Sequence, residues 1–197
     1  MHVYIVFCHP SKKSFTFSVL ESFVAGLREA GHTFTIGDLY EMNFQSDMDL
    51  EQYNRETSFE PSLPVPDDVA TEQAKIAQAN ALVFIYPVWW SDCPAKLKGW
   101  FDRVWTFGYA YTYESDGHKS SHIGIAKALV ICPAGHPVEH LEETGIAQSM
   151  RRIMLDDRLG GVGIENAKME ILGGMVDQDP KVRERNLNRA NELGRML

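Results

Sequence analysis

The chain has 197 residues, 44% of them hydrophobic, and a formal net charge of −8, so its length suits a single domain (residues 1–197) with a complete core. Its dispersed Lys and Arg residues do not provide the basic surface that nucleic acid binding requires, and no apolar run approaches the roughly 20 residues of a membrane-spanning helix. The three cysteines lack CxxC spacing, and the amino terminus enters a strand pattern without a basic or cleavable segment. We therefore expect no disulfide framework, no nucleic acid or membrane partner, and a cytoplasmic location.

The first βα unit contains a candidate anion site. Residues 3–8 form an apolar run that predicts a buried strand, and a helical pattern begins at Phe17. The loop between them carries the hydroxyl groups of Ser11, Ser14 and Thr16. Such a loop can bind an anion because unpaired backbone N–H groups and the helix dipole converge there. It has neither the GxGxxG nor the GxxxxGK[ST] pattern, and a serine-capped helix without a ligand is the alternative interpretation.

The next part of the chain returns to the sheet through a long connection. Residues 33–39 predict a second strand, which completes a βαβ unit with a right-handed crossover. Residues 40–66 are rich in Asp, Glu, Asn and Pro and exceed the length that a compact fold needs, so they are a subunit contact, a lid or a solvated loop. Residues 67–80 begin with acidic side chains that suit a helix amino terminus.

The most informative stretch follows. Residues 81–86 are uninterruptedly apolar, as a parallel strand covered on both faces requires, and Pro87 ends that strand. Apolar residues at helical spacing then predict a helix over residues 94–105. The loop between strand and helix carries Trp89 and Trp90, which are costly to expose unless they cover something flat.

The remainder of the chain continues the alternation of strands and helices. Residues 107–113 are rich in tyrosine without a regular period, and we expect them to line a pocket or to contact a second subunit. The later patterns predict a strand, a helix, a half-exposed edge strand and a final helix, over residues 127–131, 138–157, 167–171 and from Asp179 onward.

These elements predict an α/β fold, a three-layer sandwich with a five-stranded parallel sheet, although pattern alone does not choose the strand order. In such sheets ligands bind outside the carboxyl ends of the strands. Three loops should meet there, over residues 9–16, 87–93 and 132–140. Hydroxyl donors, indoles and a glycine turn with two histidines suit the phosphate, the ring and the ring edge of a flavin mononucleotide half.

Residues 86–104, YPVWWSDCPAKLKGWFDRV, and the tyrosine-rich residues 109–113 resemble the signature region of the flavodoxin-like NAD(P)H:quinone oxidoreductases of the DT-diaphorase and modulator-of-drug-activity type. The resemblance covers nearly the whole chain, including the His-Pro loop and Asp38-Leu39-Tyr40. It implies the flavodoxin-like strand order 2-1-3-4-5 and a homodimer. It also implies hydride transfer from NADH or NADPH, through bound FAD or alternatively FMN, to a quinone or a similar flat acceptor.

The same resemblance implies roles for individual residues. The residues that would hold the flavin phosphate are His9, Ser14, Phe15 and Thr16. Those that would lie along the ring edge with their backbone amides are Pro87, Val88, Trp89 and Trp90. Those that would cover the pyrimidine end are Cys132, Pro133, Ala134 and Gly135. The pocket residues that would reach the active site of a partner subunit are Tyr111 and Tyr113.

A proton donor is harder to assign. His140, one helical turn after His136, could add a positive charge or donate a proton, and it falls near a tyrosine of the mammalian pattern. Two helix-surface histidines without a role are the alternative. No third ligand accompanies the pair, so no metal site is predicted.

The three cysteines each follow a predicted strand. They are interpreted as small buried hydrophobic residues, and a reactive thiol is the alternative. A one-electron flavodoxin-type carrier and a regulatory flavoprotein subunit are the competing functions.

Overall fold

The computed structural model describes residues 1–177 and 179–197. Its main sheet has five parallel strands in the order β2-β1-β3-β6-β7, which confirms the predicted α/β fold and the order 2-1-3-4-5. The strands of this sheet are β1 (His2–Phe7), β2 (Thr33–Asp38), β3 (Ala81–Ile85), β6 (Lys127–Pro133) and β7 (Ala167–Leu172). None of the helices in the described part of the chain combines the length and apolar character needed to span a bilayer.

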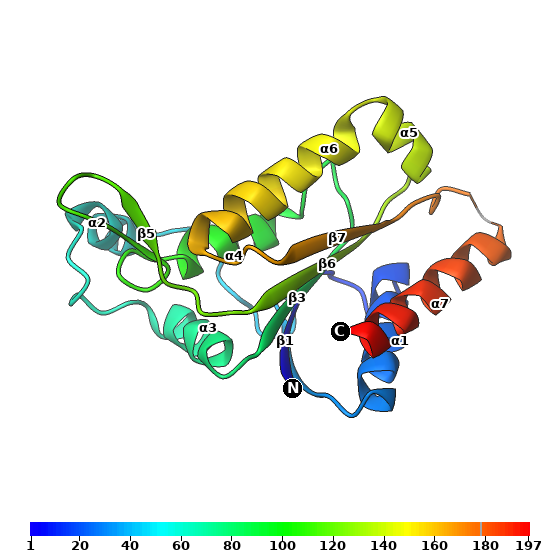
Figure 1. Ribbon diagram of the computed structural model, residues 1–197, viewed down its shortest axis with the longest axis horizontal. Coiled ribbons are helices and arrows are strands. Elements are labelled where there is room, and N and C mark those ends of the chain that lie inside the picture. The colour runs from blue at the N-terminus through cyan, green and yellow to red at the C-terminus, as the bar shows by residue number, and fades with distance from the viewer. Residues whose placement is uncertain (178) are drawn as a thin grey trace.

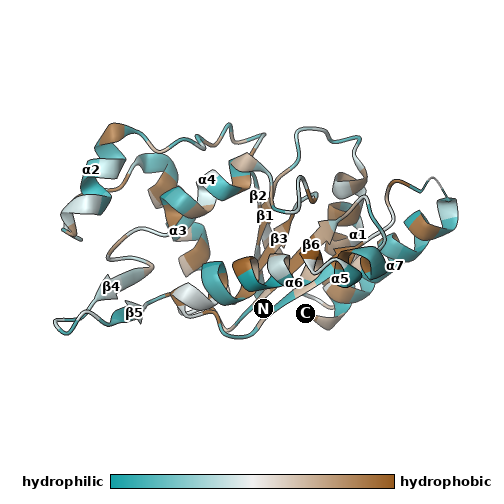
Figure 2. Cartoon of the chain, turned by 90° about the horizontal axis from the view of Figure 1, so that it is seen from above, coloured by the Kyte–Doolittle hydropathy of each residue, from teal (hydrophilic) through white to brown (hydrophobic). Residues whose placement is uncertain are grey.

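Helices cover both faces of the sheet, because successive strand residues point to opposite sides. Val3, Ile5 and Phe7 of β1 pack toward α1 (Phe15–Glu29) and α7 (Pro180–Met196). The alternate residues of the same strand pack toward a second layer, which consists of α3 (Asp67–Ala77), α4 (Ala95–Val104), α5 (Val138–Glu143) and α6 (Ile146–Arg151). Figure 1 shows these layers on either side of the sheet, and in Figure 2 the apolar colour gathers in the central strands.

Helices α1 and α7 approach closely through two glycines. A Cβ atom on Gly26 would lie 2.0 Å from the carbonyl oxygen of Asn191, and one on Gly194 would lie 2.2 Å from that of Phe23. Neither position has room for a side chain, so glycine allows the two backbones to touch. This contact places the carboxyl-terminal helix beside the first loop of the sheet edge.

The long connection at residues 40–66 contains a helix that its sequence pattern did not predict. Helix α2 (Leu50–Ser58) begins at Asp49, whose side chain accepts a hydrogen bond from the backbone N–H of Gln52 at 2.8 Å. The buried residues of α2 are Gln52 and Arg55. Because the inward face is polar, the segment lacks the apolar periodicity that marks a surface helix.

Two further segments differ from their predictions. The aromatic segment continues into an antiparallel hairpin, β4 (Tyr111–Tyr113) with β5 (Lys119–Ser121), which lies at the same end of the molecule as α2 (Figure 1). The helix predicted over residues 138–157 is broken between α5 and α6 at Gly145, whose φ of 74° lies in the left-handed region. Helix α6 continues into a π-helical segment, Arg152–Leu159.

Candidate active site

The loops that follow β1, β3 and β6 are joined at the carboxyl edge of the sheet. The imidazole of His9 lies edge-on to the indole of Trp89, with ring centres 6.0 Å apart. The backbone N–H of Val88 donates to the carbonyl of Pro133 at 2.8 Å. Direct contacts therefore connect the first loop with the second, and the second with the last residue of β6, where the third loop begins. These contacts lie at the edge where parallel sheets bind ligands. We call this the rim: residues 9–16, 87–93 and 134–140.

In the first loop, the imidazole of His9 is hydrogen-bonded to the backbone of Ser11. Its Nδ1 accepts a hydrogen bond from the backbone N–H of Ser11 at 3.0 Å, which requires an unprotonated nitrogen. Partial burial lowers the pKa of His9, against an opposing effect of the Ser11 carbonyl. The free proton of the neutral ring is then on Nε2.

The amino terminus of α1 is capped, as the alternative interpretation expected, and still offers donors. The hydroxyl oxygen of Ser14 accepts a hydrogen bond from the backbone N–H of Phe17 at 3.1 Å. The N–H groups of Phe15 and Thr16, in the first turn, have no helical acceptor. The guanidinium of Arg183 lies over the ring of Phe15, 5.2 Å from its centre, and adds positive charge beside this turn.

The second loop is a tight turn with unusual backbone geometry. Trp89 and Asp92 exchange two backbone hydrogen bonds, of 3.0 and 3.2 Å. The two residues between them, Trp90 and Ser91, have φ values of 49° and 64°, the pattern of a type I′ turn. The side chain of Trp90 is fully exposed and that of Trp89 is 42% exposed. Because the amides of Val88 and Trp89 already have partners, the turn presents chiefly its indoles to a ligand.

A residue that no sequence pattern indicated holds this turn. Arg158, from the π-helical segment, donates to both carboxylate oxygens of Asp92 at 2.9 Å. Burial raises the pKa of Asp92, but the hydrogen bonds from Arg158 and from the backbone of Cys93 outweigh it, and the pKa is lowered overall. No local signal identifies Arg158, because its partner lies 66 residues away in the sequence.

The third loop begins two residues later than predicted. Cys132 and Pro133 belong to β6 and are buried, so their side chains are part of the core and not of the loop. The Sγ of Cys132 lies 3.7 Å from the carbonyl of Glu170. The backbone N–H of Ala134 donates to the carbonyl of Leu172 at 3.0 Å, and Gly135 is exposed. Of the four residues expected here, only the last therefore leaves its backbone open to solvent.

The histidine pair lies beside this loop. The rings of His136 and His140 are 4.8 Å apart and both residues are exposed. Only His140 belongs to α5, because His136 precedes the start of that helix at Val138, so the expected pairing on one helix surface is wrong. Among the described residues, no group of three or more His, Cys, Asp and Glu side chains could hold a metal ion. The exposed position of His140 permits proton transfer to a ligand at the rim, and this role stays a prediction.

Tyr111 and Tyr113 lie in a separate aromatic cluster. Their rings pack against each other at 5.7 Å, and both pack against Phe107. Phe59, just beyond α2, contacts Phe107 and Tyr113 at 5.3 and 6.0 Å. The ring contacts that the structure records for the two tyrosines are with this cluster and not with the rim of the same chain.

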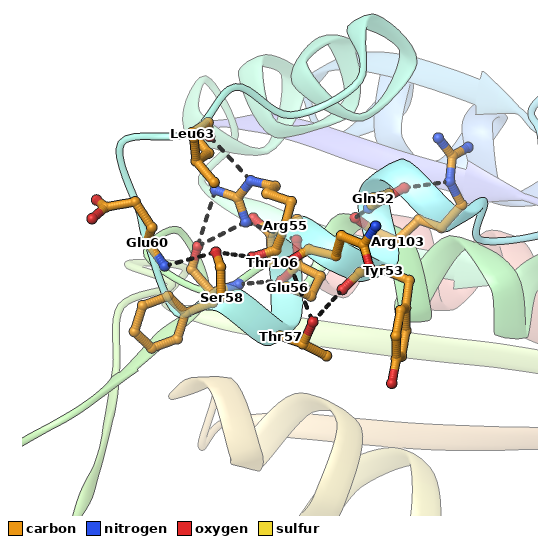
Figure 3. A network of polar contacts seen from close by, with 12 residues as sticks. Gln52, Tyr53, Arg55, Glu56, Thr57, Ser58, Glu60, Leu63, Arg103 and Thr106 are labelled. Atoms are coloured by element: carbon orange, nitrogen blue, oxygen red, sulfur yellow. Dashed lines mark hydrogen bonds and ion pairs between the residues drawn. The ribbon is translucent and has the colours of Figure 1, made fainter.

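Polar contacts fix α2 against the segment that leads into the hairpin (Figure 3). Gln52 and Arg103 exchange two hydrogen bonds of 2.8 Å, one to a backbone carbonyl and one between side chains. Arg55 donates to the carbonyl of Phe107 at 3.3 Å, while Glu56 accepts from the N–H of Phe107 at 2.8 Å. The long connection is thus an anchored element in this structure, not a purely solvated loop.

The three cysteines are free and buried. Burial raises the pKa of each thiol, of Cys8, Cys93 and Cys132, to about 12. A thiol with such a pKa remains protonated at neutral pH and is a poor nucleophile. The interpretation as small buried hydrophobes is the one that this geometry favours.

Comparisons with known proteins agree with the fold. A family model described as flavodoxin-like fold matches residues 1–193. The structure of an NAD(P)H:quinone oxidoreductase from Methanothermobacter marburgensis is 61% identical, with a TM-score of 0.95, and the match covers 99% of this chain and 98% of the other. An FMN-dependent NADH-azoreductase from Bacillus anthracis, solved with FMN, matches over 98% and 97% of the two chains with a TM-score of 0.74; at 19% identity it shows the shared fold alone.

A curated relative is similar over most of its length. An uncharacterized NAD(P)H oxidoreductase from Haemophilus influenzae is 30% identical over 185 residues, which are 93% of this chain and 89% of the relative. The match of the family model spans nearly the whole sequence, as the signature segment indicated. The chain therefore belongs to the family of flavodoxin-like fold proteins that includes the NAD(P)H:quinone oxidoreductases.

Proposed function

We propose that the protein is a flavin-dependent NAD(P)H:quinone oxidoreductase, which transfers two electrons as hydride from NADH or NADPH to a quinone or a similar flat acceptor. The observation that carries the proposal is the rim. A helix amino terminus, an exposed indole turn and a glycine loop lie together there, in a chain 61% identical to an NAD(P)H:quinone oxidoreductase. This combination favours an enzyme over a one-electron carrier or a regulatory subunit.

The donor set at the rim fits a flavin. His9 Nε2, the hydroxyl groups of Ser14 and Thr16 and the free N–H groups of the first turn of α1 would hold the phosphate. The indoles of Trp89 and Trp90 offer flat apolar area to the ring. A Cβ atom on Gly135 would meet only Val176, at 3.4 Å, so the third loop leaves space for a flat edge.

A flavin held by these residues would supply the hydride chemistry between the nicotinamide and the acceptor, in alternating half-reactions. The side chains of the rim bind and orient the reactants and exclude water from them. We assign to His140 the donation of a proton to the reduced acceptor, because its imidazole is exposed beside the third loop.

A second copy of the chain is proposed to complete the site. Apolar residues that are more than half exposed gather on α2 and the hairpin: Leu50, Tyr53, Phe59 and Tyr113. Large exposed apolar side chains that gather at one end of a molecule favour an interaction site there. In a homodimer built over this surface and α4, Tyr111 and Tyr113 would line the acceptor pocket of the neighbouring subunit.

The proposed cofactor is FAD, with FMN as the alternative. The test is a visible absorption spectrum of the purified protein after addition of each flavin and desalting, repeated without oxygen with NADH and with NADPH. Retained flavin bands that bleach with a nicotinamide and recover with a quinone are the expected result. Loss of both flavins on desalting would refute the proposal, and release of the bound flavin distinguishes FAD from FMN by its mass.

A further inference from the structure

The turn at the rim adopts a conformation that L-residues avoid. Two successive non-glycine residues, Trp90 and Ser91, have φ values of 49° and 64°. Positive φ is uncommon for non-glycine residues and an outlier for a bulky side chain, so the surrounding structure must hold it. The backbone bridge between Trp89 and Asp92 closes the turn, but it does not fix the turn relative to the rest of the rim.

A salt bridge from another element supplies that fixation. The guanidinium of Arg158 binds Asp92 through two parallel hydrogen bonds, each of 2.9 Å. Asp92 Oδ1 also accepts from the backbone N–H of Cys93 at 2.7 Å. The side chain of Arg158 is only 10% exposed, whereas that of Asp92 is 44% exposed. Arg158 is therefore the buried, fixed partner of the pair, and it holds the exposed turn that contains Asp92 in position.

Helix α4 and the residue that caps its carboxyl end contact both the backbone and the side chain of Arg158. The indole N–H of Trp105 donates to the carbonyl of Arg158 at 3.2 Å, and the guanidinium lies over the ring of Phe101, 5.6 Å from its centre. The residue belongs to the π-helical segment Arg152–Leu159. Single stretches of π-helix are rare and occur frequently at functional sites, where they redirect a side chain.

We propose that Arg158 is a positioning residue that sets the conformation of the Trp89–Trp90 turn for flavin and acceptor binding; this assignment rests on the proposed function. The planar fork of arginine matches both carboxylate oxygens at once, which a lysine ammonium does not. The pair also neutralises a carboxylate two residues from the exposed indole, where an unpaired negative charge would repel phosphate groups.

The test compares Arg158→Gln, Asp92→Asn, the double variant and Arg158→Lys with the parent protein. The matched control is Arg151→Gln, which removes a surface pair with Glu142 of 2.7 Å on the neighbouring helix. We expect each of the first two variants to raise the dissociation constant for flavin about ten-fold, as loss of a charged hydrogen bond does. Both should raise KM for a quinone more than they lower kcat, and Arg158→Lys should recover only part of the loss.

The double variant decides whether the two residues act through one contact. The double variant should raise the dissociation constant for flavin as much as the more impaired single variant does. Either substitution alone already removes the paired hydrogen bonds between Arg158 and Asp92. Additive losses, full recovery by Arg158→Lys, or flavin binding equal to that of the parent in both single variants would overturn the assignment. If Arg158→Gln does not fold, the half-exposed Asp92→Asn still decides the question.

Near-ultraviolet circular dichroism of the flavin-free protein provides a second readout. A changed tryptophan signal in Arg158→Gln and Asp92→Asn, but not in Arg151→Gln, is expected whether or not flavin binds. A parent protein that retains no flavin would therefore refute the proposed function alone. An unchanged tryptophan signal in both rim variants would refute the role of Arg158.

Discussion

Glu72 connects three elements of the core and offers a direct test of what holds them together. This carboxylate of α3 is completely buried. One of its oxygens accepts from the hydroxyl of Tyr4 in β1 and from Nε1 of Trp100 in α4 at 2.8 Å, and the other from Lys75 at 2.6 Å. Burial, with the charge and the hydrogen bond of Glu72, raises the pKa of Tyr4 well above its usual value, so Tyr4 remains a donor.

The cost of Glu72→Ala follows from the donors left behind. The Tyr4 hydroxyl and the Trp100 N–H would stay buried without an acceptor, at about 1–3 kcal/mol each. The side chain of Lys75 is 24% exposed and can turn to water, so it adds little. We expect a loss of about 3–5 kcal/mol, the range for breaking a buried charged pair, out of the roughly 5–15 kcal/mol that stabilise a typical domain.

Equilibrium unfolding in urea measures this loss. The midpoint should fall while the slope of free energy against urea stays unchanged, and Glu72→Gln, which keeps one acceptor oxygen, should lose less. The control is Asp102→Ala, which removes an exposed pair with Lys98 and should change the free energy by less than about 0.5 kcal/mol. A Glu72→Ala protein within about 1 kcal/mol of the parent would show that the network does not support the core.

Three other predictions test packing, thiol chemistry and pH dependence. Gly26→Ala should cost about 1–3 kcal/mol in the same assay despite a better helix propensity, because its Cβ would lie 2.0 Å from a carbonyl of α7, whereas Gly124→Ala, with no atom within 4 Å, should be neutral. At pH 8 a thiol with a pKa of about 12 is ionised in only about one molecule in ten thousand, so a disulfide reagent should label none of the three cysteines until urea unfolds the protein. Because burial lowers the pKa of His9 in the folded state, the unfolded chain takes up its proton first, so the parent should lose stability relative to His9→Gln as the pH falls below 6.5 and not above it. A folded protein that reacts with the reagent, or equal pH profiles for the parent and His9→Gln, would contradict the second and third predictions.

Much of the sheet could be predicted because its strands are buried on both faces. Every residue of β3, Ala81–Ile85, is buried, and so are five of the six residues of β1. Such strands consist of short apolar runs, which are visible in the sequence. Helix starts were also predictable where the cap is local, as at Ser14 and Asp179, whose side chains bond to N–H groups two or three residues ahead. Parallel order then brings the rim loops to one edge.

The sequence by itself determined the apolar periodicity, the caps and the loops that follow buried strands, because each of these depends on residues within a few positions of one another. The tertiary structure alone decided which polar groups pair. Helix α2 buries Gln52 and Arg55 against a distant segment, and Arg158 meets Asp92 across 66 residues. The amides of Val88 and Trp89 likewise find their acceptors within the fold. A polar side chain is stable inside a protein only with a partner, and the folded positions of both residues select that partner.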